Sequence, residues 1–345
     1  MDIRYVPNLR WKRGEKNALR DLSVAGRENV LPLFLIGSDQ FKPKKATTKK
    51  AEVPAPLVFA QEIFNCWGAS PFYLDASSIP DTPGHDHRLY EIANHCRAME
   101  LELISVIRPE ATASYLNTVK KVVAHDNRGV CLRISLQEMS EIPKWIGSWP
   151  FSLKETDLVI DYLNQAESLL SFGEVVLAEA FRALHKGDKW RSVTIVGTSI
   201  PDNFAGLTSG LYKIPRHEKV IWNQLQSAPL PYQLHFGDYA TVSTTAPAPG
   251  IAWGFPITAK YTLQEEFLIC RGVRTTGLGA EDADVQLVKH AKSIASHPDR
   301  HVLSHCWADG EIDKIETGLN GPRNLEHWVR LGVNRHIELV RSMLP

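Results

Sequence analysis

Residues 129–135 read Gly-Val-Cys-Leu-Arg-Ile-Ser, and residues 157–162 read Asp-Leu-Val-Ile-Asp-Tyr. Both segments are short and apolar, and they lack the strict alternation of a strand that has one face in water. In each of them a charged side chain stands among apolar neighbours near the carboxyl end. This pattern is typical of parallel strands that helices cover on one side and that line the interior of a barrel on the other.

Six further segments repeat the pattern, and helical stretches separate them along the chain. The eight predicted strands are Tyr5–Trp11, Val30–Ile36, Phe72–Ala76, Leu101–Ile107, Gly129–Ser135, Asp157–Tyr162, Ser192–Thr198 and Tyr232–Tyr239. This alternation predicts an α/β protein with a TIM-like (β/α)₈ barrel, formed as a single domain over residues 1–345. In a competing count, Glu266–Arg271 is the eighth strand and the first segment is a lid. We favour the first count because the helix that begins near Gly14 would otherwise follow no strand.

Three segments do not belong to a minimal barrel. Residues 40–53 form a lysine-rich loop insertion after the second strand. Residues 251–275 predict an extra β-hairpin that flanks the barrel, and a helix at Ala280–Ala295 would follow it as the last helix of the barrel. Residues 324–344 have apolar side chains at helical spacing and predict a C-terminal helix, packed on the outside of the barrel or on a second subunit.

Composition and charge exclude few classes of function. Lys+Arg and Asp+Glu both total 39, so the net charge gives no reason to expect a membrane or nucleic-acid partner, although a nucleic acid is not excluded. The five cysteines are scattered without a Cys-x-x-Cys pair, which indicates reduced thiols rather than a disulfide framework. The first 13 residues hold no long apolar run, so we expect neither a signal peptide nor a membrane span, and a cytoplasmic protein.

Charged residues gather where the predicted strands end. Because side chains alternate between the two faces of a strand, Asp75, Arg133 and Asp161 are expected to converge on the barrel interior. Lys12, Glu15 and Asp238 are expected to join them at the same open end, where barrel enzymes carry their active sites. The alternative is an ion-pair network that plugs the barrel, because a buried arginine needs carboxylate partners in any case.

Weaker candidates lie around the same opening. They are Arg108 after the fourth strand, the hydroxyls of Thr198 and Ser199 after the seventh, Tyr239 after the eighth, and Arg271 on the hairpin. No glycine-rich phosphate loop, nucleophile elbow or Ser-His-Asp order is visible. We expect no metal site, because the His-Asp-His tripeptide at residues 85–87 precedes a predicted helix rather than lying on a strand.

Several motifs resemble the phage "beta protein" family. They are Tyr-Val-Pro-Asn-Leu-Arg-Trp-Lys-Arg-Gly-Glu-Lys-Asn-Ala-Leu at residues 5–19, Leu-Pro-Leu-Phe at 31–34, Gly-Asp-Tyr at 237–239, Glu-Phe-Leu at 266–268 and Arg-Gly at 271–272. The resemblance implies a protein found in phages and in bacterial mobile or defence-associated loci, and it implies no particular activity. It also implies that the family pattern emphasises Lys12, Glu15, Asp238 and Arg271. The lysine insertion departs from the usual short connection.

These observations favour a barrel whose mouth binds an anionic small molecule, nucleotide-like or phosphorylated, in conflict between bacterium and phage. Lys12, Arg133 and Arg271 would hold the anion, and Glu15, Asp161 or Asp238 would orient it or act as a general base. This hypothesis requires no cofactor, and it leaves open whether the protein is an enzyme.

Two other functions stay open at this point. Asp75, Asp161 and Asp238 would be oxygen ligands for Mg²⁺ in a phosphodiesterase. Alternatively, the barrel is non-catalytic and binds a protein partner from a neighbouring gene through its hairpin and its C-terminal helix. A homo-oligomer also agrees with the sequence.

Overall fold

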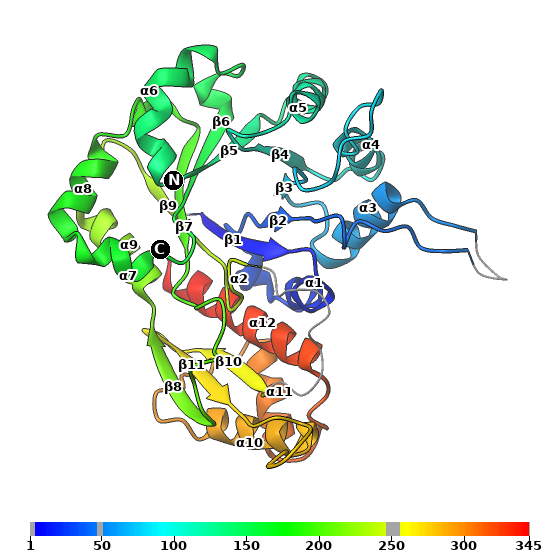
Figure 1. Cartoon of the computed structure of the whole chain (residues 1–345), viewed down its shortest axis with the longest axis vertical. Coiled ribbons are helices and arrows are strands. Elements are labelled where there is room, and N and C mark those ends of the chain that lie inside the picture. The colour runs from blue at the N-terminus through cyan, green and yellow to red at the C-terminus, as the bar shows by residue number, and fades with distance from the viewer. Residues whose placement is uncertain (1–3, 47–50, 246–255, 345) are drawn as a thin grey trace.

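The computed structural model describes residues 4–46, 51–245 and 256–344, and its centre is a closed barrel of eight parallel strands (Figure 1). The strands, in their order around the barrel, are β1 (Tyr5–Arg10), β2 (Leu33–Leu35), β3 (Phe72–Asp75), β4 (Leu103–Ile107), β5 (Val130–Ser135), β6 (Thr156–Asp161), β7 (Ser192–Gly197) and β9 (Leu234–Asp238). The predicted (β/α)₈ barrel is confirmed. The competing count is wrong, because β1 pairs with both β2 and β9 and closes the sheet.

Helices follow the strands and cover the outside of the barrel. They are α1 (Arg13–Arg20), α2 (Val24–Arg27), α3 (Ala55–Cys66), α4 (Leu89–Ala98), α5 (Ala113–Asp126), α6 (Ile142–Trp145), α7 (Ala166–Ser171), α8 (Glu174–Arg182) and α9 (His217–Ser227). Helix α5 shows why they form where they do: the Thr112 side chain accepts the Tyr115 N–H at the start, and Asn127 takes the left-handed conformation at the end. Its buried face carries Tyr115 and Val119, which pack against the outer face of the strands.

The eighth helix of the barrel is not the one that the sequence predicts. Helix α12 (Leu325–Met343) packs against α1 and α2, and its residues Val333 and Ile337 belong to the barrel core. Helix α10 (Ala283–Ala295), predicted to complete the barrel, instead packs with α11 (Trp307–Glu316) in a separate hydrophobic cluster. Both helices are amphipathic, so their pattern alone does not tell which apolar surface each one covers.

A small antiparallel sheet lies beside the barrel, in the order β10 (Thr258–Thr262), β11 (Glu266–Arg271) and β8 (Gly210–Pro215) (Figure 1). Strands β10 and β11 form a hairpin within residues 251–275, and β8 is a third strand that the sequence analysis missed. Strand β8 follows β7 in the chain, and the hairpin of β10 and β11 follows β9. The small sheet therefore lies at the carboxyl ends of the barrel strands. Ala259, Tyr261 and Leu268 on one face pack against α10, α11 and α12, and Lys260, Phe267 and Ile269 occupy the other face.

The lysine-rich insertion projects from the barrel beside α3 (Figure 1). Its two described arms are joined by backbone hydrogen bonds between Lys44 and Val53, and Lys42 is exposed. Lys49 and Lys50 lie outside the described residues.

Two further features bear on the setting of the protein. All five cysteines are buried and unpaired, as the sequence predicts. Among the described residues, no helix has the length and apolar character needed to cross a membrane.

Candidate binding site at the barrel mouth

Asp75, Arg133 and Asp161 meet inside the barrel, as the alternation of side chains along β3, β5 and β6 predicts. The Arg133 Nε donates to Asp161 Oδ2 at 3.0 Å, and its Nη1 donates to Asp75 Oδ2 at 3.3 Å. All three residues are buried, with at most 5% of their surface exposed. Beneath them the interior is filled by apolar side chains, among them Val106, Val159 and Val196.

Arg108 and Tyr239 complete this ion-pair network. Arg108 Nε donates to Asp75 Oδ2 at 2.8 Å, and the Tyr239 hydroxyl donates to Asp161 Oδ2 at 2.6 Å while it accepts from Arg133. Burial alone would raise the pKa of Asp75, but Arg108 and Arg133 hold it below its ordinary value. Every charge in the network therefore has a partner, and the group fits the alternative of an ionic plug better than that of a catalytic centre.

The aspartates at the strand ends also hold their own turns. In each case the carboxylate accepts the backbone N–H two residues further on: Asp75 from Ser77 at 3.2 Å, Asp161 from Leu163 at 2.9 Å and Asp238 from Ala240 at 2.8 Å. This is the Asx-turn geometry, in which a short side chain replaces a backbone acceptor. The regular appearance of aspartate at these positions therefore has a structural cause.

Asp238 does not face the barrel interior, which corrects the prediction that it joins the other charges. Its neighbour Tyr239 points inward, so Asp238 points outward to the helix layer. There it accepts from the Tyr5 hydroxyl and from His336 Nε2 on α12, both at 2.7 Å. Burial would raise the pKa of Asp238, but His336 and the hydrogen bond from Tyr5 hold it below its ordinary value.

In the described part of the chain, no three potential metal ligands are grouped.

The hydroxyls after β7 serve the fold rather than an open binding site. Thr198 Oγ1 accepts the Ile200 N–H at 3.1 Å within its own turn. Ser199 Oγ donates to Glu218 and accepts the His217 N–H at the start of α9. The predicted role of Thr198 and Ser199 as anion ligands is therefore not supported by their contacts.

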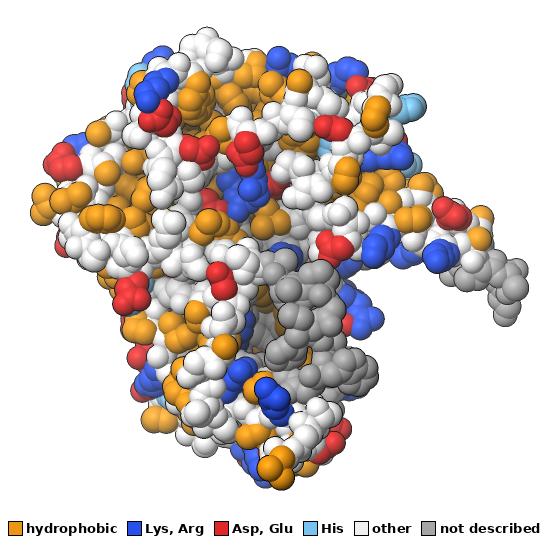
Figure 2. Space-filling model, viewed as in Figure 1, with side chains coloured by type: hydrophobic (Ala, Val, Ile, Leu, Met, Phe, Trp, Pro, Cys, Tyr) orange, Lys and Arg blue, Asp and Glu red, His pale blue; other side chains and the backbone are white. Residues whose placement is uncertain are grey.

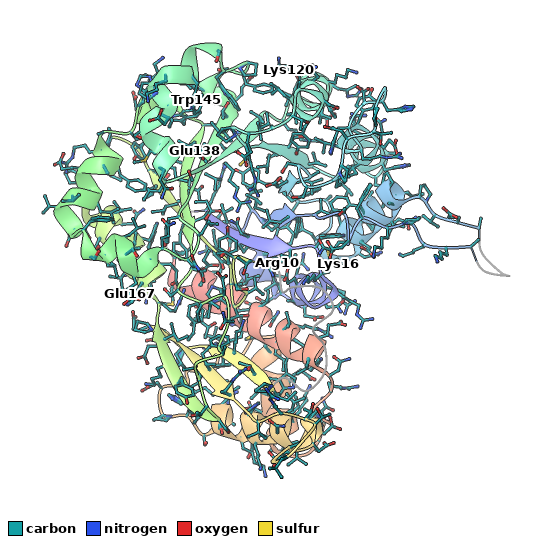
Figure 3. The ribbon with its side chains drawn as sticks, in the orientation of Figure 1. Arg10, Lys16, Lys120, Glu138, Trp145 and Glu167 are labelled. Atoms are coloured by element: carbon teal, nitrogen blue, oxygen red, sulfur yellow. The ribbon has the colours of Figure 1, made fainter. Side chains whose placement is uncertain are left out.

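A second charged group lies where the barrel adjoins the small sheet. Arg10 ends β1, Glu15 lies in the first turn of α1 and is 2% exposed, and Lys260 is at the centre of β10. Arg10 Nη2 donates to the Ser243 carbonyl at 2.6 Å, and Lys260 Nζ donates to the Thr241 carbonyl at 2.7 Å. Figure 3 shows Arg10 at the edge of the barrel that faces the small sheet.

The electrostatics of this second group are unusual. Burial is the main cause that raises the pKa of Glu15, to about 8, although Arg10 and Lys12 act against it. Burial, followed by the charge of Arg10, lowers the pKa of Lys260 to about 8, and burial also lowers the pKa of Arg10. Glu15 Oε2 is buried and has no hydrogen-bond partner. These groups are less well satisfied than the network inside the barrel.

Lys12 and Arg271 belong to this second group rather than to the interior network. Lys12 occupies the N-cap position of α1, without a capping hydrogen bond from its side chain, and its charge lowers the pKa of Glu15 against the effect of burial. Arg271 pairs in register with Thr258, two residues from Lys260 and on the same face of the small sheet, and donates to Thr258 Oγ1 at 2.6 Å. The structure therefore does not bring Arg271 to Arg133. We call Arg10, Lys12, Lys260 and Arg271 the basic junction. Figure 2 shows Lys and Arg side chains both on the barrel and on the lower part of the molecule that carries the small sheet.

The sequence analysis missed Arg10 and Lys260. Arg10 follows Val6 and Asn8 at intervals of two, so the alternation of side chains along the first strand places it at the inner rim of the barrel. Lys260 stands between Ala259 and Tyr261, which are both buried. A lysine between apolar residues of a predicted hairpin is the sequence feature that could have identified Lys260 as a candidate site residue.

The closed barrel with charged side chains at its strand ends defines an α/β protein of the TIM-barrel class. The chain belongs to the Beta protein family, whose model matches residues 5–341. A search of curated proteins finds no match.

Two solved structures match this chain at low identity. Triosephosphate isomerase from Bartonella henselae is 9% identical, with 70% of this chain and 94% of that chain covered and a TM-score of 0.35. A "putative oxidoreductase" from Bacteroides fragilis is also 9% identical, with 99% and 97% covered and a TM-score of 0.18. Neither likeness carries an argument about function, and the barrel assignment stands on the strand pairing of this chain.

Proposed function

We propose that this protein binds an anionic small molecule, phosphorylated or nucleotide-like, at the basic junction. One observation carries the proposal: Arg10 and Lys260 are partly buried cations that donate to backbone carbonyls, and neither forms an ion pair with any described residue. A cation that has lost part of its hydration is stabilised by an anionic partner. A bound phosphate or carboxylate would supply that partner.

The charge balance around the junction supports an anion rather than a cation. Glu15 is the carboxylate that acts on both Arg10 and Lys260, and with a pKa of about 8 it is mostly protonated at neutral pH. Asp202 acts on Arg10 alone, so the cations of the junction outnumber the carboxylates. Residues 246–255 read Ala-Pro-Ala-Pro-Gly-Ile-Ala-Trp-Gly-Phe, so this segment of the β9–β10 connection has no carboxylate side chain to contribute. The junction therefore carries net positive charge at neutral pH.

The geometry favours this function over the two alternatives. Arg133 lies between Asp75 and Asp161, and Asp238 points to the other side of its strand, so these carboxylates do not form a Mg²⁺ site. Helix α12, proposed as a surface for a protein partner, is largely buried between the barrel and the small sheet. A setting in phage or bacterial defence, and a location in the cytoplasm, remain part of the proposal and rest on the family resemblance and the composition.

The test is ligand-dependent thermal unfolding with pyrophosphate, ATP and uncharged adenosine at low and high salt. We expect the two anions to raise Tm, by mass action on the folded state, and salt to weaken the effect by screening. An Arg10→Gln and Arg271→Gln double variant should lose the shift. Lys213→Gln, on the opposite face of the same sheet, is the matched control and should retain it. If neither anion shifts wild-type Tm, or both shift the double variant equally, the proposal is wrong.

A further inference from the structure

The connection between β5 and β6 lacks a full helix. Helix α6 has four residues there and lies between two 3₁₀ turns, η1 (Gln137–Glu141) and η2 (Ile146–Ser148), whereas α5 on the neighbouring connection has 14 residues. A helix advances only about 1.5 Å per residue, so α6 is too short to cover the strands beside α5. Individual side chains of the connection, among them Trp145 and Trp149, pack against the barrel core instead.

A cavity of about 310 Å³ remains at this place, beside the carboxyl end of β4. It is lined by the buried Ile107 of β4 and Leu132 of β5, by Leu116 of α5, and by the partly buried Trp145 and Trp149. Figure 2 shows apolar side chains gathered on the surface between α6 and α5, the helices that Figure 1 labels there. The cavity is therefore open to a ligand, and most of its lining is apolar.

The two tryptophans give the cavity its chemical character. Their ring centroids are 6.1 Å apart and the ring planes are inclined by 61°, so the two indoles do not stack face to face. Trp149 Nε1 donates to Thr156 Oγ1 at 3.1 Å, whereas no described residue accepts a hydrogen bond from Trp145 Nε1. Two indole rings and an N–H without an acceptor suit a flat ring that carries a hydrogen-bond acceptor.

The charge at the rim of the cavity is already balanced. Arg108 is the charged residue among the described residues that line it, and its Nε donates to Asp75 Oδ2 at 2.8 Å. Its Nη2 lies 2.7 Å from the same oxygen, and its Nη1 lies 4.0 Å from Glu110. An ionic ligand therefore finds no unpaired charge here, but the planar guanidinium is suited to contact with an aromatic ring.

We infer that this cavity, the tryptophan pocket, binds an uncharged heteroaromatic ring, the chemical class to which the nucleobases belong. Its volume lies at the lower end of the range for small-molecule sites, about 300–1,000 Å³, and suits one ring system of one or two rings. The ring stacks on an indole and accepts a hydrogen bond from Trp145. In the strand order of the barrel, β4 and β5 lie opposite β9 and β1, so the tryptophan pocket is separate from the basic junction.

The probe for this site is 2-aminopurine riboside, an uncharged fluorescent nucleoside whose emission falls when its ring stacks on another aromatic ring. We expect the wild-type protein to quench the probe in a saturable way, and adenosine to restore the emission by displacing it. Ribose and pyrophosphate, which lack the ring, should not displace it. High salt should leave the quenching unchanged, because an uncharged ring forms no ion pair that salt would screen. Adenosine should likewise raise Tm independently of salt, unlike pyrophosphate.

Two variants change the pocket in opposite ways. Trp145→Leu removes a stacking surface, and Ala111→Phe fills the cavity from the β4–α5 loop without removing any of its aromatic lining. Each should weaken binding of the probe by about tenfold or more, the size of the contribution from one aromatic stacking partner. Ala111→Phe keeps the inference testable if Trp145→Leu fails to fold. The matched control is Trp307→Leu, which should bind as the wild type does, because Arg330 already covers the Trp307 ring at 4.0 Å.

The outcomes separate this inference from the proposed function. Absence of quenching by the wild type, or equal quenching by Ala111→Phe, would show that the pocket does not bind the ring. If N-acetyltyrosinamide displaces the probe and adenosine does not, the pocket accepts an aromatic side chain of a protein and the inference is wrong. Displacement by pyrophosphate would place the probe at the basic junction and also contradict it. The Arg10→Gln and Arg271→Gln double variant should bind the probe as the wild type does, so the two sites succeed or fail independently.

Discussion

Replacing Arg133 with alanine should destabilise the barrel strongly. Arg133 is 5% exposed, and its guanidinium links Asp161, Asp75 and the Tyr239 hydroxyl inside the barrel. Its removal leaves Asp161 with the Tyr239 hydroxyl and one backbone N–H as partners. Asp75 keeps its hydrogen bonds from Ser77, and the partly exposed Arg108 becomes the cation that balances its charge.

The expected cost is about 3–5 kcal/mol, the range found when one member of a buried ion pair is removed and its charge is left unbalanced. Part of that cost comes from the cavity that the long side chain leaves beneath the mouth. Equilibrium unfolding in urea, followed by the fluorescence of the nine tryptophans, measures the change in the free energy of unfolding.

The matched control is Arg88→Ala, which removes an arginine from a pair with Glu91 in which both side chains are about half exposed. That variant should lose no more than about 0.5 kcal/mol, since exposed pairs contribute little. If Arg133→Ala costs less than about 1 kcal/mol while the m-value is unchanged, the network is not the ionic plug that its geometry indicates.

Three further predictions follow from individual contacts. Glu15→Gln should remove a pH dependence of the free energy of unfolding. The pKa of Glu15 in the folded protein, about 8, lies above the ordinary 4.5, so the stability of the wild type falls as pH rises from about 4.5 to 8. Urea unfolding that gives the same dependence on pH for both proteins would contradict this. His336→Ala should lower the free energy of unfolding by about 3–5 kcal/mol at pH 7, because the buried Asp238 loses a partner. The difference in stability from the wild type should become smaller as pH falls through the lowered pKa of Asp238. A difference that stays constant down to the pH of acid unfolding would contradict a role for this pair. Replacing residues 45–50 with a Gly/Ser linker should change stability by less than about 0.5 kcal/mol, because Phe41 and the Lys44–Val53 pairing are retained; a larger loss in thermal unfolding would show that the insertion is structural.

The barrel was predictable because its strands are short apolar runs separated by amphipathic helices. The side-chain alternation along β3, β5 and β6 was enough to bring Asp75, Arg133 and Asp161 together. Asp238 differs because Gly237 and Tyr239 fill the inward positions of β9, so the same alternation turns Asp238 toward the helix layer. Strand β8 was missed because its side chains alternate between partly buried and exposed positions in a loop region, without the apolar run of a barrel strand.

The assignment of chemistry to residues was harder to predict for a physical reason. Charged side chains at strand ends look the same in a sequence whether they neutralise one another, hold a turn or bind a ligand. Arg133 and the three aspartates satisfy one another or their own turns, whereas Arg10 and Lys260 lack a carboxylate partner among the described residues. Only the three-dimensional charge balance distinguishes these two cases.

The position of α12 explains why the basic junction forms at all. The chain leaves the barrel after β9 and builds the small sheet with α10 and α11. It then returns with α12, which packs on both α1 and β10. The same helix brings His336 to Asp238 and to the Thr262 hydroxyl, so the last barrel strand, the eighth helix and the small sheet are tied at one point. The packing of α12 consequently holds Lys260 where the charges of Arg10 and Glu15 act on its pKa. The site therefore depends on the insertion between β9 and α12, and a barrel with a short connection at that point would retain the ionic plug and lose Lys260.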